Sequence, residues 1–141
     1  MPFPLDPATP FGARVAQRLQ AELVIWMTTV DPNGTPQPSP VWFYWDGDRF
    51  LIYSRANTAR ERNIARNPRV SLHFDSDGQG GNIVVFTGEA SIDRAAPPVT
   101  ATPGYLEKYR AHISRIGSTP ERFSLGYPLP IRVRPTRVRG H

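Results

Sequence analysis

Short runs of β-branched and aromatic residues, each closed by a turn signal, constrain the fold of this chain more than any other feature. The run 24–30 ends at the hairpin turn Asp31-Pro32-Asn33-Gly34, and its partner strand is expected to run through 41–45. Further strands are expected at 49–54, 69–74, 83–92 and about 129–139, and Gly88 predicts a bulge. Because the strands follow in hairpin order, they predict a mainly β fold, an antiparallel barrel with short peripheral helices.

The remaining segments predict helices around this barrel. Thr9-Pro10 is a typical N-cap and first helical position, and apolar residues recur at helical spacing behind it. Further helices are expected over 58–66, over 105–116 and from Thr119-Pro120 onwards. We therefore expect a single domain over residues 1–141. Its parts are an N-terminal helix at about 10–22, a barrel at about 23–92 and 129–139, and a helical insert at about 103–124.

Two of the expected strands are apolar on both faces. A strand in a one-sided sheet alternates polar and apolar residues, whereas 24–27 and 41–45 are apolar or aromatic throughout. Either helices cover the outer face of the barrel, or a second copy of the chain does. Since few helices are available, we expect a homodimer.

Composition excludes several classes of protein. The chain has no cysteine and three scattered histidines, which argues against a disulfide scaffold or a metal site. No apolar run reaches the length of a membrane span and no secretory signal is recognisable, so we expect a soluble cytoplasmic protein without a membrane partner. The net charge is +5, and all basic residues except Lys108 are arginine. A basic protein can bind nucleic acid, but a GC-rich genome also favours arginine over lysine, so the charge is weak evidence. A nucleic-acid-binding barrel is therefore kept only as a rival interpretation, and no nucleic-acid partner is expected.

The segment from Tyr53 to Ile64 carries the strongest functional signal. It is the end of a strand, a short loop and a helix that starts at Thr58, with arginines in its first turns. Thr58 and Glu61 match a capping box. A helix N-terminus attracts anions, and arginine supplies donors that match phosphate geometry. The segment therefore predicts a phosphate site, with a solvated helix face as the alternative interpretation.

The order of several motifs resembles the pyridoxamine-phosphate-oxidase-like split-barrel family. Within that family, the likeness is to the actinobacterial branch of flavin and deazaflavin (coenzyme F420) oxidoreductases, and it covers nearly all of 23–92. The motifs are Trp26-Met27-Thr28-Thr29, Pro38-x-Pro40-Val41-Trp42-Phe43, Tyr53-Ser54, Arg60-x-Arg62-Asn63-Ile64 and Asn67-Pro68-x-Val70-Ser71-Leu72. Tyr105-Leu106-x-Lys108-Tyr109 and Ile131-Arg132-Val133-Arg134-Pro135 also resemble that branch.

The resemblance implies a cofactor site. The ring would lie against the strand matching Pro40 to Phe43, and the phosphate would be held by a strand-end hydroxyl matching Ser54 and by a basic pair at the helix start. The second member of that pair matches Arg60, but the first falls on Ala59, so we ask whether Arg55 replaces the missing cation. The full set implied for the cofactor is Pro40, Val41, Trp42, Phe43, Ser54, Arg55, Thr58, Ala59, Arg60, Asn63 and Asn82, with Asn82 reaching the partner subunit's cofactor.

The implied activity is that of an F420-dependent oxidoreductase, which transfers hydride between its deazaflavin and a small organic substrate. Hydride chemistry resides in such a cofactor, so no acid–base pair is required and no catalytic residue is singled out. The alternatives are an FMN-binding oxidase or reductase of the same fold and a non-catalytic protein that binds F420 or flavin. The arginines of the last strand, at 132, 134, 137 and 139, either attract the acidic tail of F420 or face water. His73 is expected near the cofactor or, as a structural residue, at the dimer seam.

Overall fold

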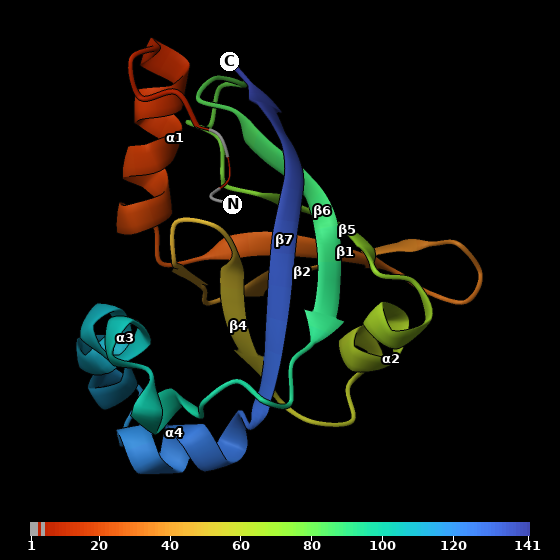
Figure 1. The fold of residues 1–141 in the computed structure, drawn as a ribbon, viewed down its shortest axis with the longest axis vertical. Coiled ribbons are helices and arrows are strands. Elements are labelled where there is room, and N and C mark those ends of the chain that lie inside the picture. The colour runs from red at the N-terminus through yellow and green to blue at the C-terminus, as the bar shows by residue number, and fades with distance from the viewer. Residues whose placement is uncertain (1–2, 4) are drawn as a thin grey trace.

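The computed structural model describes residue 3 and residues 5–141, and it contains an antiparallel sheet of seven strands (Figure 1). The strands are β1 (Ile25–Val30), β2 (Pro36–Val41), β3 (Tyr44–Trp45), β4 (Phe50–Ser54), β5 (Arg69–His73), β6 (Val84–Ile92) and β7 (Leu129–Gly140). Neighbouring strands follow the order β2-β1-β5-β6-β7-β4-β3. The mainly β fold predicted from the sequence is confirmed.

The two edge strands of the sheet are almost consecutive in the chain. β2 ends at Val41 and β3 begins at Tyr44, so only Trp42 and Phe43 separate them. Two residues span only a few ångströms of chain. The sheet must therefore curl until its edges approach each other, and Trp42 and Phe43 form the corner between them, which we call the 42–43 corner.

The expected strand 41–45 was wrong in its bounds. The structure divides it at the 42–43 corner, and the partner of β1 begins earlier, at Pro36. Prolines at 36, 38 and 40 concealed this strand, because proline cannot serve as a donor inside a sheet. β2 is an edge strand, where proline is tolerated on the open side.

The barrel interior is filled by apolar side chains from all seven strands. Phe50 is completely buried and packs edge-to-face against Phe43 and Phe86, with ring centroids 5.8 and 5.2 Å apart. The bulge expected at Gly88 is confirmed, since the β6–β7 register shifts between Thr87 and Gly88. A Cβ on Gly88 would lie 2.5 Å from the Arg134 carbonyl oxygen, so this close approach requires glycine.

The helices are α1 (Pro10–Ala21), α2 (Ala59–Arg66), α3 (Pro103–Arg115) and α4 (Pro120–Gly126), with a 3-10 turn η1 at Val99–Ala101. Each of the four lies within a few residues of a segment where the sequence predicts a helix. α3 and α4 lie together at the end of the barrel away from the C-terminus (Figure 1). In the part of the chain that the structure describes, no helix combines the length and apolarity needed to cross a bilayer.

α3 and α4 form a second apolar cluster with the outward-facing residues of β4. Leu51 and Tyr53 contribute from the strand, and Tyr105, Tyr109 and Phe123 contribute from the two helices. Trp42 packs against the same cluster. Helices therefore cover the outer face of the sheet at the 42–43 corner. From the apolar pattern alone, either helices or a second copy of the chain could have covered it. The homodimer stays a prediction.

Candidate functional site

Two adjoining cavities lie at the junction of β2, the end of β4 and the start of α2. The first, which we call the aromatic pocket, measures about 520 Å³, and its lining includes Pro40, Val41, Trp42, Ser54 and Tyr127. The second, the arginine pocket, measures about 680 Å³, and its lining includes Ser39, Ala59, Arg62 and Arg66. Thr58 and Arg60 line both cavities. The two cavities therefore lie next to each other on either side of Thr58 and Arg60.

Arg60 is the cation between the two pockets. Its Nη1 donates to the Ser54 hydroxyl at 3.1 Å, and its Nη2 donates to the Ser39 hydroxyl at 2.8 Å. Its Nε is buried and has no hydrogen-bond partner within the described residues. No carboxylate of those residues lies within 4.0 Å of the guanidinium. Burial lowers the pKa of Arg60. A half-buried cation held only by two hydroxyls has the donors and the uncompensated charge that a phosphate would satisfy.

The local sequence explains why Arg60 points into this junction. Thr58 caps α2, and its hydroxyl accepts a hydrogen bond from the Glu61 N–H at 3.2 Å. The Glu61 carboxylate accepts from the Asn57 N–H at 2.8 Å, one residue before the cap. Asn57 adopts a φ of 63°, which turns the chain from the end of β4 into the helix. Glu61 lines neither pocket, so the helix start presents a cation without a neighbouring acid.

The arginine pocket carries three guanidinium groups and one carboxylate. Arg62 donates to the Asn57 carbonyl, and Arg66 donates to the Val30 carbonyl and the Asn63 side chain. The carboxylate is that of Asp31, and it already accepts hydrogen bonds from the Asn33 and Thr35 N–H groups of the hairpin turn. A hydrogen bond from the Thr35 N–H is the main reason that the pKa of Asp31 is lowered. The cavity therefore has a net positive lining.

A column of stacked rings forms one wall of the aromatic pocket. Trp42 lies parallel to Tyr109 and to Phe123, with centroid distances of 4.7 and 5.3 Å, and Phe123 stacks on Tyr127 at 4.4 Å. The Arg55 guanidinium lies 4.6 Å from the Tyr127 ring centroid and donates to its hydroxyl at 3.3 Å. Arg55 is thereby held at the pocket by an aromatic side chain.

The open edge of β2 offers main-chain carbonyl oxygens as hydrogen-bond acceptors but no main-chain N–H donors. Successive residues of a strand direct their main-chain groups to opposite sides. Pro36, Pro38 and Pro40 have no N–H, so the residues between them must supply the donors that pair with β1. The proline carbonyls therefore face the open edge, and Pro40 brings one of them to the aromatic pocket.

The structure brings together nine of the eleven residues that the resemblance implied. Seven line the aromatic pocket: Pro40, Val41, Trp42, Ser54, Arg55, Thr58 and Arg60. Ala59 and Asn63 line the arginine pocket, where the buried Asn63 amide donates to Thr29 at 3.0 Å. Phe43 lines neither pocket, and its side chain is completely buried in the barrel.

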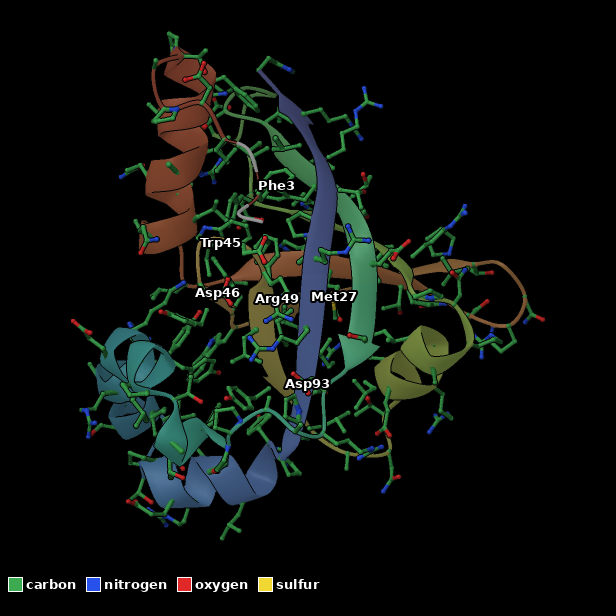
Figure 2. The ribbon with its side chains drawn as sticks, viewed as in Figure 1. Phe3, Met27, Trp45, Asp46, Arg49 and Asp93 are labelled. Carbon is green, nitrogen blue, oxygen red and sulfur yellow. The ribbon has the colours of Figure 1, made fainter. Side chains whose placement is uncertain are left out.

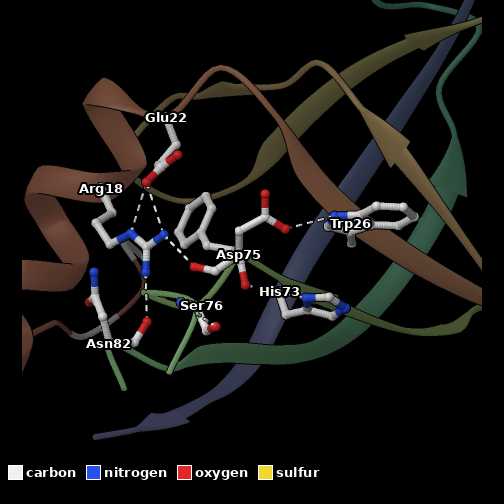
Figure 3. Close-up of polar contacts among 9 residues, drawn as sticks. Arg18, Glu22, Trp26, His73, Asp75, Ser76 and Asn82 are labelled. Atoms are coloured by element: carbon white, nitrogen blue, oxygen red, sulfur yellow. Dashed lines mark hydrogen bonds and ion pairs between the residues drawn. The ribbon is translucent and has the colours of Figure 1, made fainter. Parts of the chain in front are cut away.

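Asn82 lies elsewhere, two residues before β6 and beside α1. Its carbonyl accepts from Arg18 at 2.8 Å, in a group of contacts that also holds Glu22 and Asp75 (Figure 3). Asn82 lines neither pocket, and its role toward a partner subunit stays a prediction. In the same view, His73 stacks on Trp26 with ring centroids 6.3 Å apart, and it also lines neither pocket.

The arginines of β7 do not line either cavity. Arg132 forms ion pairs with Asp46 at 3.6 Å and Asp93 at 3.2 Å, two residues labelled in Figure 2, and Arg134 pairs with Glu89 at 3.1 Å. Arg134, Arg137 and Arg139 are exposed, as the interpretation in which they face water expects, whereas the Arg132 side chain is only 17% exposed.

Four residues of the site were not predicted from the sequence. Tyr105, Phe123 and Tyr127 line the aromatic pocket, and Ser39 holds Arg60. The four-residue spacing of Phe123 and Tyr127 was a usable signal, because it places both rings on one side of a helix. Nothing in the sequence indicated that this side would face Trp42.

Comparisons with known proteins place this geometry in a family. A family model described as pyridoxamine 5'-phosphate oxidase matches residues 11–141. An F420 reductase of solved structure is 25% identical, with a TM-score of 0.64 over 87% of this chain and 94% of that one. Two further structures, each 16% identical, share the fold. A FAD-binding protein from Mesorhizobium loti has a TM-score of 0.62, covering 89% of this chain and 88% of that one. The heme storage protein HutZ from Vibrio cholerae has a TM-score of 0.63, covering 98% of this chain and 95% of that one. No curated protein sequence matches. The chain belongs to the pyridoxamine 5'-phosphate oxidase family.

Proposed function

We propose that this protein is an F420-dependent oxidoreductase that transfers hydride between a deazaflavin and a small organic substrate. The observation that carries the proposal is the order of three environments: an aromatic pocket, the partly buried Arg60 that lines both pockets, and an arginine-lined pocket. F420 has the same order of chemical groups, namely a planar ring, a phosphate and an acidic tail. FMN ends at its phosphate and would leave the arginine pocket unused.

The residues fit such a cofactor group by group. The Pro40 carbonyl would accept from a ring N–H, and Trp42 would border the ring. Ser54, Thr58 and Arg60 would hold the phosphate, because Arg60 Nε is buried without a partner among the described residues. Arg55 lines the same pocket as Arg60 and would supply the cation that is missing at Ala59. Arg62 and Arg66 would bind the acidic tail.

The cofactor supplies the hydride chemistry when it is bound, and the protein positions it and limits the access of water. Trp42 and Tyr127 provide flat apolar walls that exclude water from one side of the pocket. Val24 and Ile116 also line this pocket and are 39% and 58% exposed. We propose that a second copy of the chain covers these two side chains and completes the site as a homodimer.

Two alternatives have support of their own. The FAD-binding structural neighbour favours a flavin, and an FMN-dependent oxidase or reductase would use the same aromatic pocket and Arg60. The heme storage neighbour favours a protein that binds a cofactor without turnover.

Titration of the purified protein with F420 and with FMN, followed by tryptophan fluorescence, tests the proposal. Trp42 lines the pocket, so ring binding should quench its emission. We expect F420 to bind about tenfold or more tightly than FMN. Saturable quenching by FMN with none by F420 would overturn the assignment. Binding of F420 without oxidation of its reduced form by nitro, quinone or enone acceptors would favour the non-catalytic alternative.

A further inference from the structure

The main chain of the 42–43 corner is held by side chains of α3. The Phe43 N–H donates to the Tyr109 hydroxyl at 2.9 Å. That hydroxyl donates to the Leu23 carbonyl at 2.7 Å, and the Phe43 carbonyl lies within its reach at 2.9 Å. Lys108 Nζ donates to the same Phe43 carbonyl at 3.0 Å. Both polar groups of the Phe43 main chain therefore depend on two consecutive residues of one helix.

Lys108 is placed by this contact and not by an acid. Its ammonium lies 3.6 Å from the centroid of the Phe43 ring, and no carboxylate of the described residues is within 4.0 Å of it. Burial lowers the pKa of Lys108 to about 8, although the more distant Glu22 opposes that shift. Keeping a partly buried ammonium here costs free energy, which the carbonyl and the ring offset in part.

Tyr109 couples this attachment to the aromatic pocket. Its ring is completely buried and lies parallel to Trp42, which lines that pocket. A separate cavity of about 320 Å³ lies beside the lysine, and its lining includes Tyr44, Gly104 and Lys108. The corner is therefore held from α3 by two side chains, one of which stacks on Trp42 and one of which borders a cavity.

We propose that Lys108 and Tyr109 are positioning residues that fix the 42–43 corner and so set the affinity of the aromatic pocket for the cofactor ring. The inference rests on the proposed function for its ring site, but the attachment itself is a property of the ligand-free chain. Neither residue is expected to contact the phosphate or the acidic tail, because neither lines the arginine pocket.

Two variants and a matched control test this role. Tyr109→Phe removes the hydroxyl that binds Phe43, and Lys108→Met removes the cation while keeping an apolar side chain. Tyr105→Phe is the control for the exchange measurement alone, because Tyr105 also lines the aromatic pocket. Tyr105 lies on the same helix, is equally buried, and its hydroxyl has no partner within the described residues. Hydrogen exchange of the Phe43 amide is measured on each ligand-free protein, and binding is measured with a deazaflavin fragment that lacks phosphate and tail, and with inorganic phosphate.

We expect Phe43 exchange to accelerate about tenfold or more in Tyr109→Phe and to be unchanged in Tyr105→Phe. Fragment affinity should fall about tenfold in both test variants, while phosphate affinity stays the same. Unchanged exchange and fragment affinity in both test variants would overturn the proposal, as would an equal loss of phosphate and fragment affinity. A wild-type protein that binds no flavin or deazaflavin would refute the proposed function, whereas the exchange result decides the attachment of the corner separately.

Discussion

Arg60 donates a hydrogen bond to the hydroxyl of Ser54 at 3.1 Å, across the turn that joins β4 to α2. Ser54 is itself almost completely buried, and its hydroxyl donates to the Arg55 carbonyl at 3.1 Å. The pair therefore has a fixed orientation before any ligand arrives. Preorganised donors lose less conformational entropy on binding, which favours affinity for an anion at this point.

Replacement of Arg60 by Met should weaken the binding of both F420 and FMN. The loss of charge-assisted hydrogen bonds to a phosphate corresponds to about 1.5–3 kcal/mol, or roughly tenfold to a hundredfold in Kd. Isothermal titration calorimetry measures the effect, and Arg137→Met is the control because Arg137 is exposed and lines neither pocket. Equal affinities for Arg60→Met and wild type would show that the phosphate is bound elsewhere.

Replacement of Tyr109 by Phe should destabilise the ligand-free protein, whereas Tyr105→Phe should not. The first change leaves the Phe43 N–H and the Leu23 carbonyl without their partner, at a cost of about 1–3 kcal/mol. The second removes a buried hydroxyl that has no partner among the described residues. Urea unfolding gives both free energies. A larger loss in Tyr105→Phe than in Tyr109→Phe would be incompatible with these contacts.

Replacement of Gly88 by Ala should lower stability through a steric clash at the bulge. The added methyl group would lie 2.5 Å from the Arg134 carbonyl oxygen. This oxygen belongs to the main chain of β7, so it cannot move aside as a flexible side chain would. We expect a loss of about 1–3 kcal/mol, measured by thermal unfolding. Gly126→Ala is the control, since its new methyl group would meet nothing within 4 Å, and it should be neutral or slightly stabilising.

Lys108 should make stability depend on pH in a predictable direction. Burial lowers its pKa from 10.5 to about 8, so between these values the unfolded chain binds more protons than the folded one. The penalty for the buried ammonium is fully present below pH 8 and is relieved as the pH rises toward 10.5, so wild type should gain stability relative to Lys108→Met over this window.

The comparison with Lys108→Met also separates the lysine from the tyrosines. Burial raises the pKa of Tyr53, Tyr105 and Tyr109. Their contribution to the stability of the folded state is therefore present at neutral pH and is lost as the pH rises above 10. These groups are present in both proteins and cancel in the difference. A flat difference, or wild type losing stability relative to the variant, would contradict the depressed pKa.

Local signals in the sequence were sufficient for much of the fold. The cap at Thr58, the turn at Asp31 and the bulge at Gly88 depend on neighbouring residues, so their positions could be predicted. The resemblance implied that Ser54 and Arg60 hold one phosphate; the two side chains are in contact at 3.1 Å, and their phosphate role stays a prediction.

The parts that the sequence did not predict depend on distant contacts. Ser39 reaches Arg60 from a proline-rich edge strand, and Phe123 reaches Trp42 from a helix eighty-one positions later in the sequence. The curvature of the sheet brings these segments together, and no local pattern records it.

If the acidic tail of F420 binds in the arginine pocket, a double variant of that pocket should lose affinity for F420 alone. Arg62→Ser/Arg66→Ser is compared with Arg137→Ser/Arg139→Ser, which removes the same charge from two exposed residues that line neither pocket. We predict that the first variant loses about tenfold or more in F420 affinity and nothing in FMN affinity, while the control loses neither. Equal F420 affinity in the two double variants, or a parallel loss of FMN affinity in the first, would contradict the account.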